Sequence, residues 1–300
     1  MDARITKQRL ANMLSYDWLK IVGIIALAAV FFSLFFTMIG TRPTDGQKFY
    51  VYSYNGLSVG GDFTQLQEKM KEDNVFAYEI LDSGSESFTA NKLYGNAAFT
   101  ARRAAGEGRV MFINDVRKKD ENGNENSQLL NLIDNKGTPQ ETFGMFLDPQ
   151  KFLNECKDYL SAFFGEDLSG DVNHEKVRET FMARNRKDAR FRSAAKREEG
   201  VLLEEARLEK LKADYLLVRS EEGKALSYVT YTSEVREHTI GFSMTQLNIT
   251  PLVYYTVEKD GEQVQEKTDI ALCLFNNGAR EGDLKYETVN FLAYLLREYR

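Results

Sequence analysis

A run of nineteen residues near the amino terminus, Ile21 to Ile39, carries no charged side chain. As a helix it would be about 28 Å long, which matches a bilayer hydrocarbon core of roughly 30 Å. Leu, Ile, Val and Phe dominate the run, and each of them favours insertion into lipid. A helix packed on the core of a soluble domain usually keeps a polar face toward water, and this run has none. The sequence therefore predicts a transmembrane helix at residues 21–39.

Basic side chains are concentrated before this run and are sparse after it. Arg4, Lys7, Arg9 and Lys20 precede it, whereas only Arg42 follows it closely. Cytoplasmic flanks carry the excess of Lys and Arg, so we expect a single-pass plasma-membrane protein with residues 1–20 in the cytoplasm. Residues 40–47 would be a linker, and residues 48–300 an extracytoplasmic domain.

A cleaved secretory signal is the competing interpretation of the same run. Such signals have an apolar region of about 7–15 residues followed by small residues at the cleavage site. This run is longer and ends in bulky side chains, Phe35 to Ile39, and no cysteine follows it closely enough to carry a lipid. We therefore expect the anchor to remain uncleaved.

The net charge and the positions of the Cys and His residues argue against a charged polymer as a partner and against a metal site. The net charge is −6 with acidic and basic residues mixed, which implies no strongly charged polymer as a partner. Cys156 and Cys273 could form one disulfide or remain two buried thiols. His174 and His238 are isolated, and no Cys/His spacing resembles a zinc site. Residues 120–131 resemble a calcium loop, but the glycine is Gly123 instead of the sixth residue, and the twelfth residue is Asn131 instead of Glu. We expect no metal site and no cofactor.

The first part of the outer region alternates between strand and helix patterns. We expect strands at 48–54, 75–81 and 109–114, with helices at 63–71, capped by Asp62, and at 91–105. Short loops between such elements favour right-handed β-α-β units on a parallel sheet. The predicted class is therefore α/β.

The remaining elements are expected from their periodicity and turn residues. Short strands are expected at 129–133 and 143–147, a helix at 149–164, strands at 226–232, 238–244, 252–258 and 269–275, and a closing helix at 284–299. Asp260-Gly261 predicts a hairpin between the last two strands. A charge-rich helical segment at 174–216 would be divided into two helices by Gly200, and its first half is basic.

That basic half has more than one interpretation. Nucleic-acid binding fits poorly, because the segment would lie outside the cell and lacks interleaved aromatic side chains. A solvated helix face explains the charges, and docking to a partner protein or to anionic lipid head groups is the alternative.

Two passages of the chain share a pattern of a strand that ends in polar residues next to a helix. The first is Ala98 to Asp115, a helix ending in Ala104-Ala105-Gly106 that leads into a strand closed by Asn114-Asp115. The second is Ile270 to Phe275, followed by Asn276-Asn277 and an apolar terminal helix. Both passages resemble extracellular solute-binding proteins of the type II periplasmic fold, and the layout also resembles membrane-anchored proteins of Gram-positive bacteria that carry such a domain outside. The resemblance implies a periplasmic-binding-protein-like domain, in one or two lobes, with 174–216 as a long charged helical insertion.

Ligands of open α/β sheets bind beyond the carboxyl ends of the strands. Polar side chains follow three of the expected strands, although any loop uses such residues. The candidate ligand-binding residues are Tyr54, Asn55, Ser83, Ser85, Asn114 and Asp115.

These patterns favour a binding module for a polar small molecule or peptide, associated with a transporter or a sensor in the membrane. The alternative is a structural or assembly subunit of a bacterial envelope complex that uses segment 174–216 for protein contact. An enzyme is not expected. Adjacent carboxylates such as Glu204 and Glu205 do not face each other on a helix, and no motif supplies a nucleophile and a base.

Overall fold

The computed structural model describes residues 7–39, 43–54, 56–88, 92–119, 121, 125–134, 145–186, 188–232 and 237–300. The chain divides into two compact units, residues 1–42 and residues 43–300. Each unit is described by itself below.

The first unit contains a single long helix, α1 (Lys7–Ile39). Its stretch Trp18–Phe35 is long and apolar enough to cross a membrane, and it is the one such helix among the described residues. Most of the described large apolar side chains of this stretch are exposed; Leu27, for example, keeps 71% of its surface accessible. This agrees with the predicted span in length and composition.

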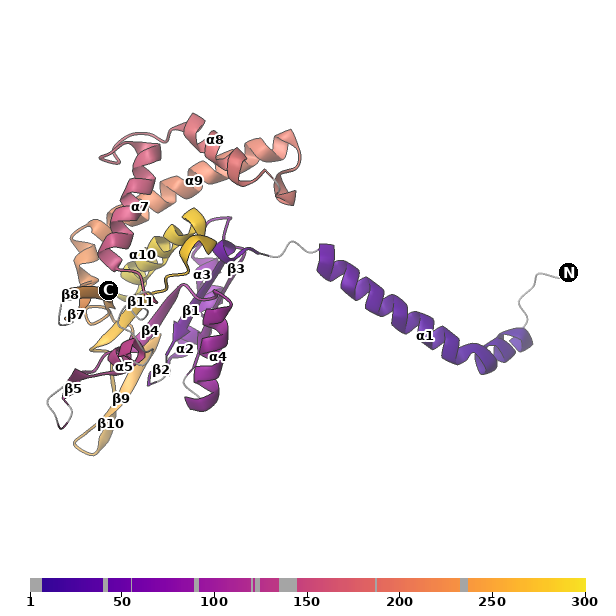
Figure 1. The fold of residues 1–300 in the computed structure, drawn as a ribbon, viewed down its shortest axis with the longest axis horizontal. Helices are drawn as coiled ribbons and strands as arrows, with labels where there is room; N and C mark the ends of the chain where they lie inside the picture. The colour runs from indigo at the N-terminus through magenta and orange to yellow at the C-terminus, as the bar shows by residue number, and fades with distance from the viewer. Residues whose placement is uncertain are drawn as a thin grey trace. The chain divides into compact units, whose positions relative to one another are not determined.

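The second unit is a mixed α/β structure built on a six-stranded sheet with the order β3-β1-β4-β11-β8-β7 (Figure 1). The strands are β1 (Lys48–Ser53), β3 (Asp82–Ser87), β4 (Val110–Asn114), β7 (Tyr228–Thr232), β8 (Glu237–Ser243) and β11 (Ile270–Leu274). Strand β1 pairs in parallel with both β3 and β4. Strands β11, β8 and β7 continue the sheet in antiparallel pairs. The parallel half was expected from the sequence, and the antiparallel half makes the sheet mixed.

Alternate side chains of the central strands point to opposite faces, and helices cover both faces. Val51, Phe112 and Leu272 belong to one buried cluster, whereas Tyr52, Met111 and Cys273 belong to another. The larger cluster includes residues of α3, α7, α9 and α10, and the smaller one includes residues of α4 and α5. The sheet is therefore the middle layer of three, which explains why these strands are apolar on both faces.

The α-helices among the described residues of this unit are α2 (Gly61–Thr64), α3 (Leu66–Glu72), α4 (Lys92–Ala104), α5 (Gln128–Asp134), α7 (Pro149–Phe164), α8 (His174–Arg184), α9 (Ala194–Arg219) and α10 (Glu287–Tyr299). The predicted helices at 91–105, 149–164 and 284–299 correspond to α4, α7 and α10. The predicted cap of the helix at 63–71 was wrong, because Gly60 is the N-cap and Asp62 lies inside α2. The Asp62 carboxylate instead accepts hydrogen bonds from Lys69 and Tyr299.

A smaller sheet corrects the predicted hairpin. Asp260 and Gly261 both have positive φ and form a turn, but it joins β9 (Val253–Lys259) to β10 (Glu262–Glu266). Strand β11 belongs to the main sheet instead. The polar β10 was not expected, because its side chains are mostly exposed and give no alternating pattern. Strand β2 (Ser58–Val59) pairs with the other edge of β9.

Three other predictions of secondary structure were wrong. The strand expected at 75–81 is irregular, and the strand lies just after it, as β3. Residues 129–133 belong to helix α5. Of 143–147, the described part forms an isolated bridge between Phe146 and Phe275, with 143–144 outside the described residues. Strand β3 lies at the edge of the sheet, and its pairing with β1 holds this Ser-rich segment in an extended conformation.

Segment 174–216 is helical as predicted, but Gly200 does not divide it. The break lies at 185–193, between α8 and α9, and Gly200 lies inside α9. A Cβ at Gly200 would overlap the Phe181 ring and lie 2.8 Å from Cε1 of Phe191. The missing side chain therefore permits the close approach of α9 to α8, and it does not end the helix.

Cys156 and Cys273 are both buried and free. They lie in the two different core clusters, on opposite faces of the sheet. Burial raises the pKa of both thiols, so both remain protonated. Of the two arrangements left open by the sequence, the structure has the pair of buried thiols.

Candidate functional site

A cavity of about 830 Å³ lies beyond the carboxyl ends of β1 and β4. From β1 the chain passes to β3 on one side, and it then crosses to β4 on the other side. In open sheets this change of direction leaves a crevice at the strand ends, where ligands of such folds bind. In Figure 1, α5, β2, β5 and β9 gather at this end of the sheet.

Five segments line the cavity. They are the loop after β1 with the start of β2, the end of β4 with the loop after it, the short hairpin of β5 (Lys118–Lys119) and β6 (Glu125–Asn126), the first turn of α5, and β9. The polar lining side chains are those of Ser58, Asn114, Lys118, Lys119, Asn126, Ser127, Gln128, Asn131, Tyr255 and Thr256. Among the described residues, the lining thus holds two cations and no carboxylate.

The loop after β1 approaches α5 closely. Gly56 has φ +91°, and a Cβ there would lie 3.3 Å from Cγ of Gln128. Both the positive φ and the short approach favour glycine at this position. The Asn114 side chain folds back, and its Oδ1 accepts a hydrogen bond of 2.8 Å from the backbone of Val116. Asn114 therefore shapes the cavity wall through the loop as well as lining it.

Asp115 is buried beside the cavity and has specific partners. Ser127 donates to it at 2.7 Å, and Arg117 donates to its other oxygen at 3.2 Å. Ser127 Oγ also accepts from the backbone of Leu130 and so caps α5. Burial raises the pKa of Asp115, while Ser127 and Arg117 act in the opposite direction. The carboxyl group thus ties α5 to the end of β4.

The sequence-predicted site residues have different places in the structure. Asn114 lines the cavity, and Asp115 supports its wall. The Tyr54 ring packs against Phe99 of α4, and Asn55 lies outside the described residues. Ser83 and Ser85 lie inside β3, where Ser83 is buried and Ser85 donates to the backbone oxygen of Phe63. The structure therefore brings the Asn114-Asp115 pair to the cavity, and does not bring the two serines there.

The residues of α5 and β9 were missed. Ser127 followed by apolar residues at 129, 132 and 133 is a capped helix pattern, so the polar face of α5 could have been found. The part of β9 that lines the cavity, Tyr255 to Val257, reaches it only through the tertiary fold.

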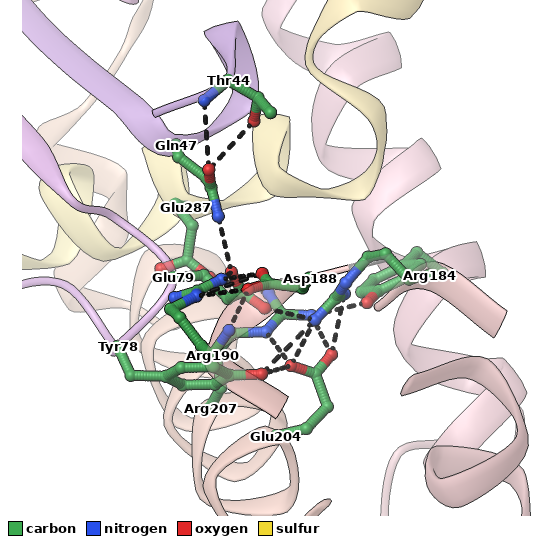
Figure 2. A network of polar contacts seen from close by, with 11 residues as sticks. Thr44, Gln47, Tyr78, Glu79, Arg184, Asp188, Arg190, Glu204, Arg207 and Glu287 are labelled. Carbon is green, nitrogen blue, oxygen red and sulfur yellow. Dashed lines mark hydrogen bonds and ion pairs between the residues drawn. The ribbon is translucent and has the colours of Figure 1, made fainter. Parts of the chain in front are cut away.

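A second, largely buried polar cluster joins residues of α7, α8, α9 and α10 to the segments that precede β1 and β3 (Figure 2). Glu204 and Arg207 of α9 form its centre, with 2% and 0% of their side chains exposed. Arg207 donates to Glu287 of α10 at 2.7 Å and to Tyr159 of α7 at 2.7 Å. This buried ion network therefore joins three helices.

The same network extends to the loop before β3. Arg184 of α8 donates to Glu204 at 2.7 Å and to Glu79 at 2.9 Å. Arg190 and Gln47 also donate to Glu79. Every carboxylate of the network thus contacts at least one guanidinium group, and this compensation is what makes burial of the charges tolerable.

The pKa shifts agree with this pairing. Burial alone would raise the pKa of Glu204, but Arg207 and Arg184 outweigh it and hold this pKa at about 2. The pKa of Glu79 is also lowered, since Arg184 and Arg190 overcome its burial. Both carboxylates therefore remain charged at neutral pH and are occupied by their partners. The geometry indicates a structural role for the network.

Comparison with known proteins identifies no relative. No protein-family model matches the chain, no curated protein matches it, and no solved structure matches its fold.

Proposed function

We propose that this protein is a membrane-anchored binding module whose cavity at the ends of β1 and β4 takes a polar small molecule or a short peptide. The observation that carries the proposal is the position of the cavity at the switch point of the sheet, together with its polar lining. Lys118 and Lys119 among the lining residues favour a ligand with a carboxylate or phosphate group.

The fold offers further support. A parallel β3-β1-β4 half followed by antiparallel β11 and a terminal helix α10 is compatible with a type II periplasmic-binding-protein-like domain carrying α8 and α9 as an insertion. Such a domain in an anchored form would hand its ligand, or the signal of its presence, to a transporter or sensor in the same membrane.

Thermal stabilisation of the full chain in detergent tests the binding role. A panel of amino acids, sugars, short peptides, dicarboxylates and phosphorylated metabolites should contain a stabilising compound, because a ligand at 100 times its Kd stabilises by about 2.7 kcal/mol. Asn131→Trp fills the cavity from α5 and should abolish the stabilisation, whereas Asn154→Trp on the exposed face of α7 should leave it intact. A panel without effect, or equal loss in both variants, refutes the proposal.

The orientation in the membrane has its own test. With residues 1–20 in the cytoplasm and α1 as the span, protease added to intact cells should degrade the C-terminal domain. Protection of that domain in intact cells, with digestion after lysis, would reverse the proposed topology.

A structural or assembly role is the second candidate. The outward face of α9 exposes Leu202, Leu203 and Leu216, the first with 62% of its surface accessible. Exposed leucines on a charged helix favour contact with another protein. If α9 contacts a partner, crosslinking in membranes should capture that partner with the wild-type chain and lose it with Leu202→Glu. Unchanged crosslinks in the variant would reject the assembly role.

A further inference from the structure

The connection between α8 and α9, together with the first residues of α9, is the most basic part of the chain. Residues 185–197, here called the basic tip, contain six Lys or Arg residues and one acidic residue, Asp188. The complete chain carries a net charge of −6. This concentration of positive charge stands out from the mixed charge of the rest of the chain.

Three arginines of the basic tip are available to a partner. Arg186, Arg192 and Arg197 are exposed, and no described carboxylate forms an ion pair with them. Arg186 and Arg197 lie together around a small cavity of about 290 Å³, and Arg197 donates its Nε to the backbone of Phe191. By contrast, Arg190 is held by Asp188 and Glu79, and Lys196 by Glu199.

The basic tip lies near the start of the second unit. The backbone N–H of Thr44 donates to Gln47, Gln47 donates to Glu79, and Arg190 donates to the same carboxylate. Three hydrogen bonds thus connect Thr44 with Arg190, as Figure 2 shows. The cavity proposed for ligands lies beyond the other end of β1.

The chain length limits how far this region can be from lipid. Ile39 ends α1 and Pro43 begins the second unit, and four residue steps reach at most about 14 Å. If α1 spans a bilayer, the head groups lie within reach of the residues around Thr44. Arginines that come within about 8–10 Å of a negative lipid surface gain from it, because the attraction falls off over that distance.

We propose that Arg186, Arg192 and Arg197 dock the basic tip on anionic lipid head groups of the membrane that holds the anchor. This inference rests on the proposed span by α1 and is independent of the ligand cavity. Docking would restrict the orientation of the domain, with the basic tip toward the lipid and the cavity away from it.

The test uses the full chain in nanodiscs of neutral lipid or of neutral lipid with anionic phosphatidylglycerol. A fluorophore on Ala195→Cys, an exposed position of the basic tip, is quenched by a nitroxide on lipid head groups. Cys156 and Cys273 are buried, so unsubstituted chain serves as the labelling blank. Quenching should be stronger in anionic discs, and it should fall to the neutral-disc value in high salt.

Charge reversal provides the matched comparison. Each basic residue near such a surface changes the docking equilibrium about five-fold, so R186E/R192E/R197E should remove the effect of anionic lipid. K71E/K157E/R219E makes the same charge change at exposed positions outside the basic tip and should retain it. Equal quenching in both kinds of disc, or equal loss in both triple variants, overturns the inference and favours a protein as the partner of the basic tip.

Failure of the anchor gives a different result. A chain that does not enter nanodiscs at all refutes the span by α1, and the docking inference with it. Neither result changes the expected stabilisation by a cavity ligand.

Discussion

The cavity and the buried ion network are both rich in polar side chains, yet they use them in opposite ways. In the network each charge faces an opposite charge, and Glu204, Arg207 and Glu287 are almost completely removed from solvent. In the cavity Lys118 and Lys119 are exposed, and no described lining residue is acidic. A closed network stabilises a fold, whereas an open set of polar groups around a cavity is suited to a ligand. Mutations should separate the two.

Removal of the central guanidinium group should have the largest effect. Arg207→Met leaves Glu204 and Glu287 buried with fewer partners and should cost about 3–5 kcal/mol of unfolding free energy. Tyrosine near-ultraviolet circular dichroism of the full chain in detergent measures it, since the one tryptophan, Trp18, lies in α1 and does not report on the domain.

Two further variants separate network loss from general damage. Lys157→Met, on the exposed face of α7, should change stability little. Replacing Arg207, Glu204 and Glu287 together by Met, Leu and Leu should regain much of the lost stability, because no charge is then left unpaired. A triple variant less stable than Arg207→Met would mean that the ions contribute more than mutual compensation.

Acidification should have the second largest effect on stability, because it protonates Glu204 of the buried ion network. The pKa of Glu204 is about 2 in the folded chain against an ordinary 4.5, so its contribution is complete above pH 4.5 and is lost as the pH falls toward 2. The difference corresponds to about 3 kcal/mol. Unfolding free energies of wild type and Glu204→Gln, measured from pH 6 to pH 2.5, should converge as the pH falls. Parallel curves would contradict the assigned pairing.

The packing of α9 on α8 should give a smaller effect. Gly200→Ala gains about 1 kcal/mol of helix propensity but overpacks Phe181 and Phe191, which should cost more than this gain. Gly61→Ala is the control, because a Cβ there meets nothing within 4 Å. A Gly200→Ala variant more stable than the wild type would contradict this close packing.

The cavity lysines should affect stability least. Lys118→Gln with Lys119→Gln should change the unfolding free energy by less than about 0.5 kcal/mol, because both side chains are exposed. The same pair should reduce stabilisation by an anionic ligand at least by half, as measured in the ligand panel. The control pair, Lys71→Gln with Lys157→Gln, makes the same change in net charge and should bind the anionic ligand as the wild type does. A large loss of stability on replacing Lys118 and Lys119 would mean that these lysines stabilise the fold.

The sequence predicted the parts of the fold in which local pattern and tertiary role agree. Strands β1 and β4 are short apolar runs and helix α7 has a clear apolar face, and the Asn114-Asp115 pair follows from the order of strands and helices. Strand β3 could not be found, because Asp82 to Ser87 forms a strand only through its pairing with β1. The apolar stretch before β3 is used for packing on the helices, with Tyr78 against Phe191.

The buried ion network was missed for a related reason. Its members are separated by up to about two hundred residues, and pairing between distant charges leaves no local pattern. One signal was present, since Glu204 and Arg207 share the buried stripe of α9 with Val201, Leu208 and Leu211. Charged residues at core positions of a helix indicate buried partners, although not which ones.

Hydrogen exchange of the full chain with and without the most stabilising compound of the panel tests the distinction most directly. We expect new protection at 56–58, 114–119, 126–131 and 255–257, the segments that line the cavity, and unchanged exchange around Glu204 and Arg207. Protection centred on the buried ion network, or no protection at the cavity despite stabilisation, would contradict it.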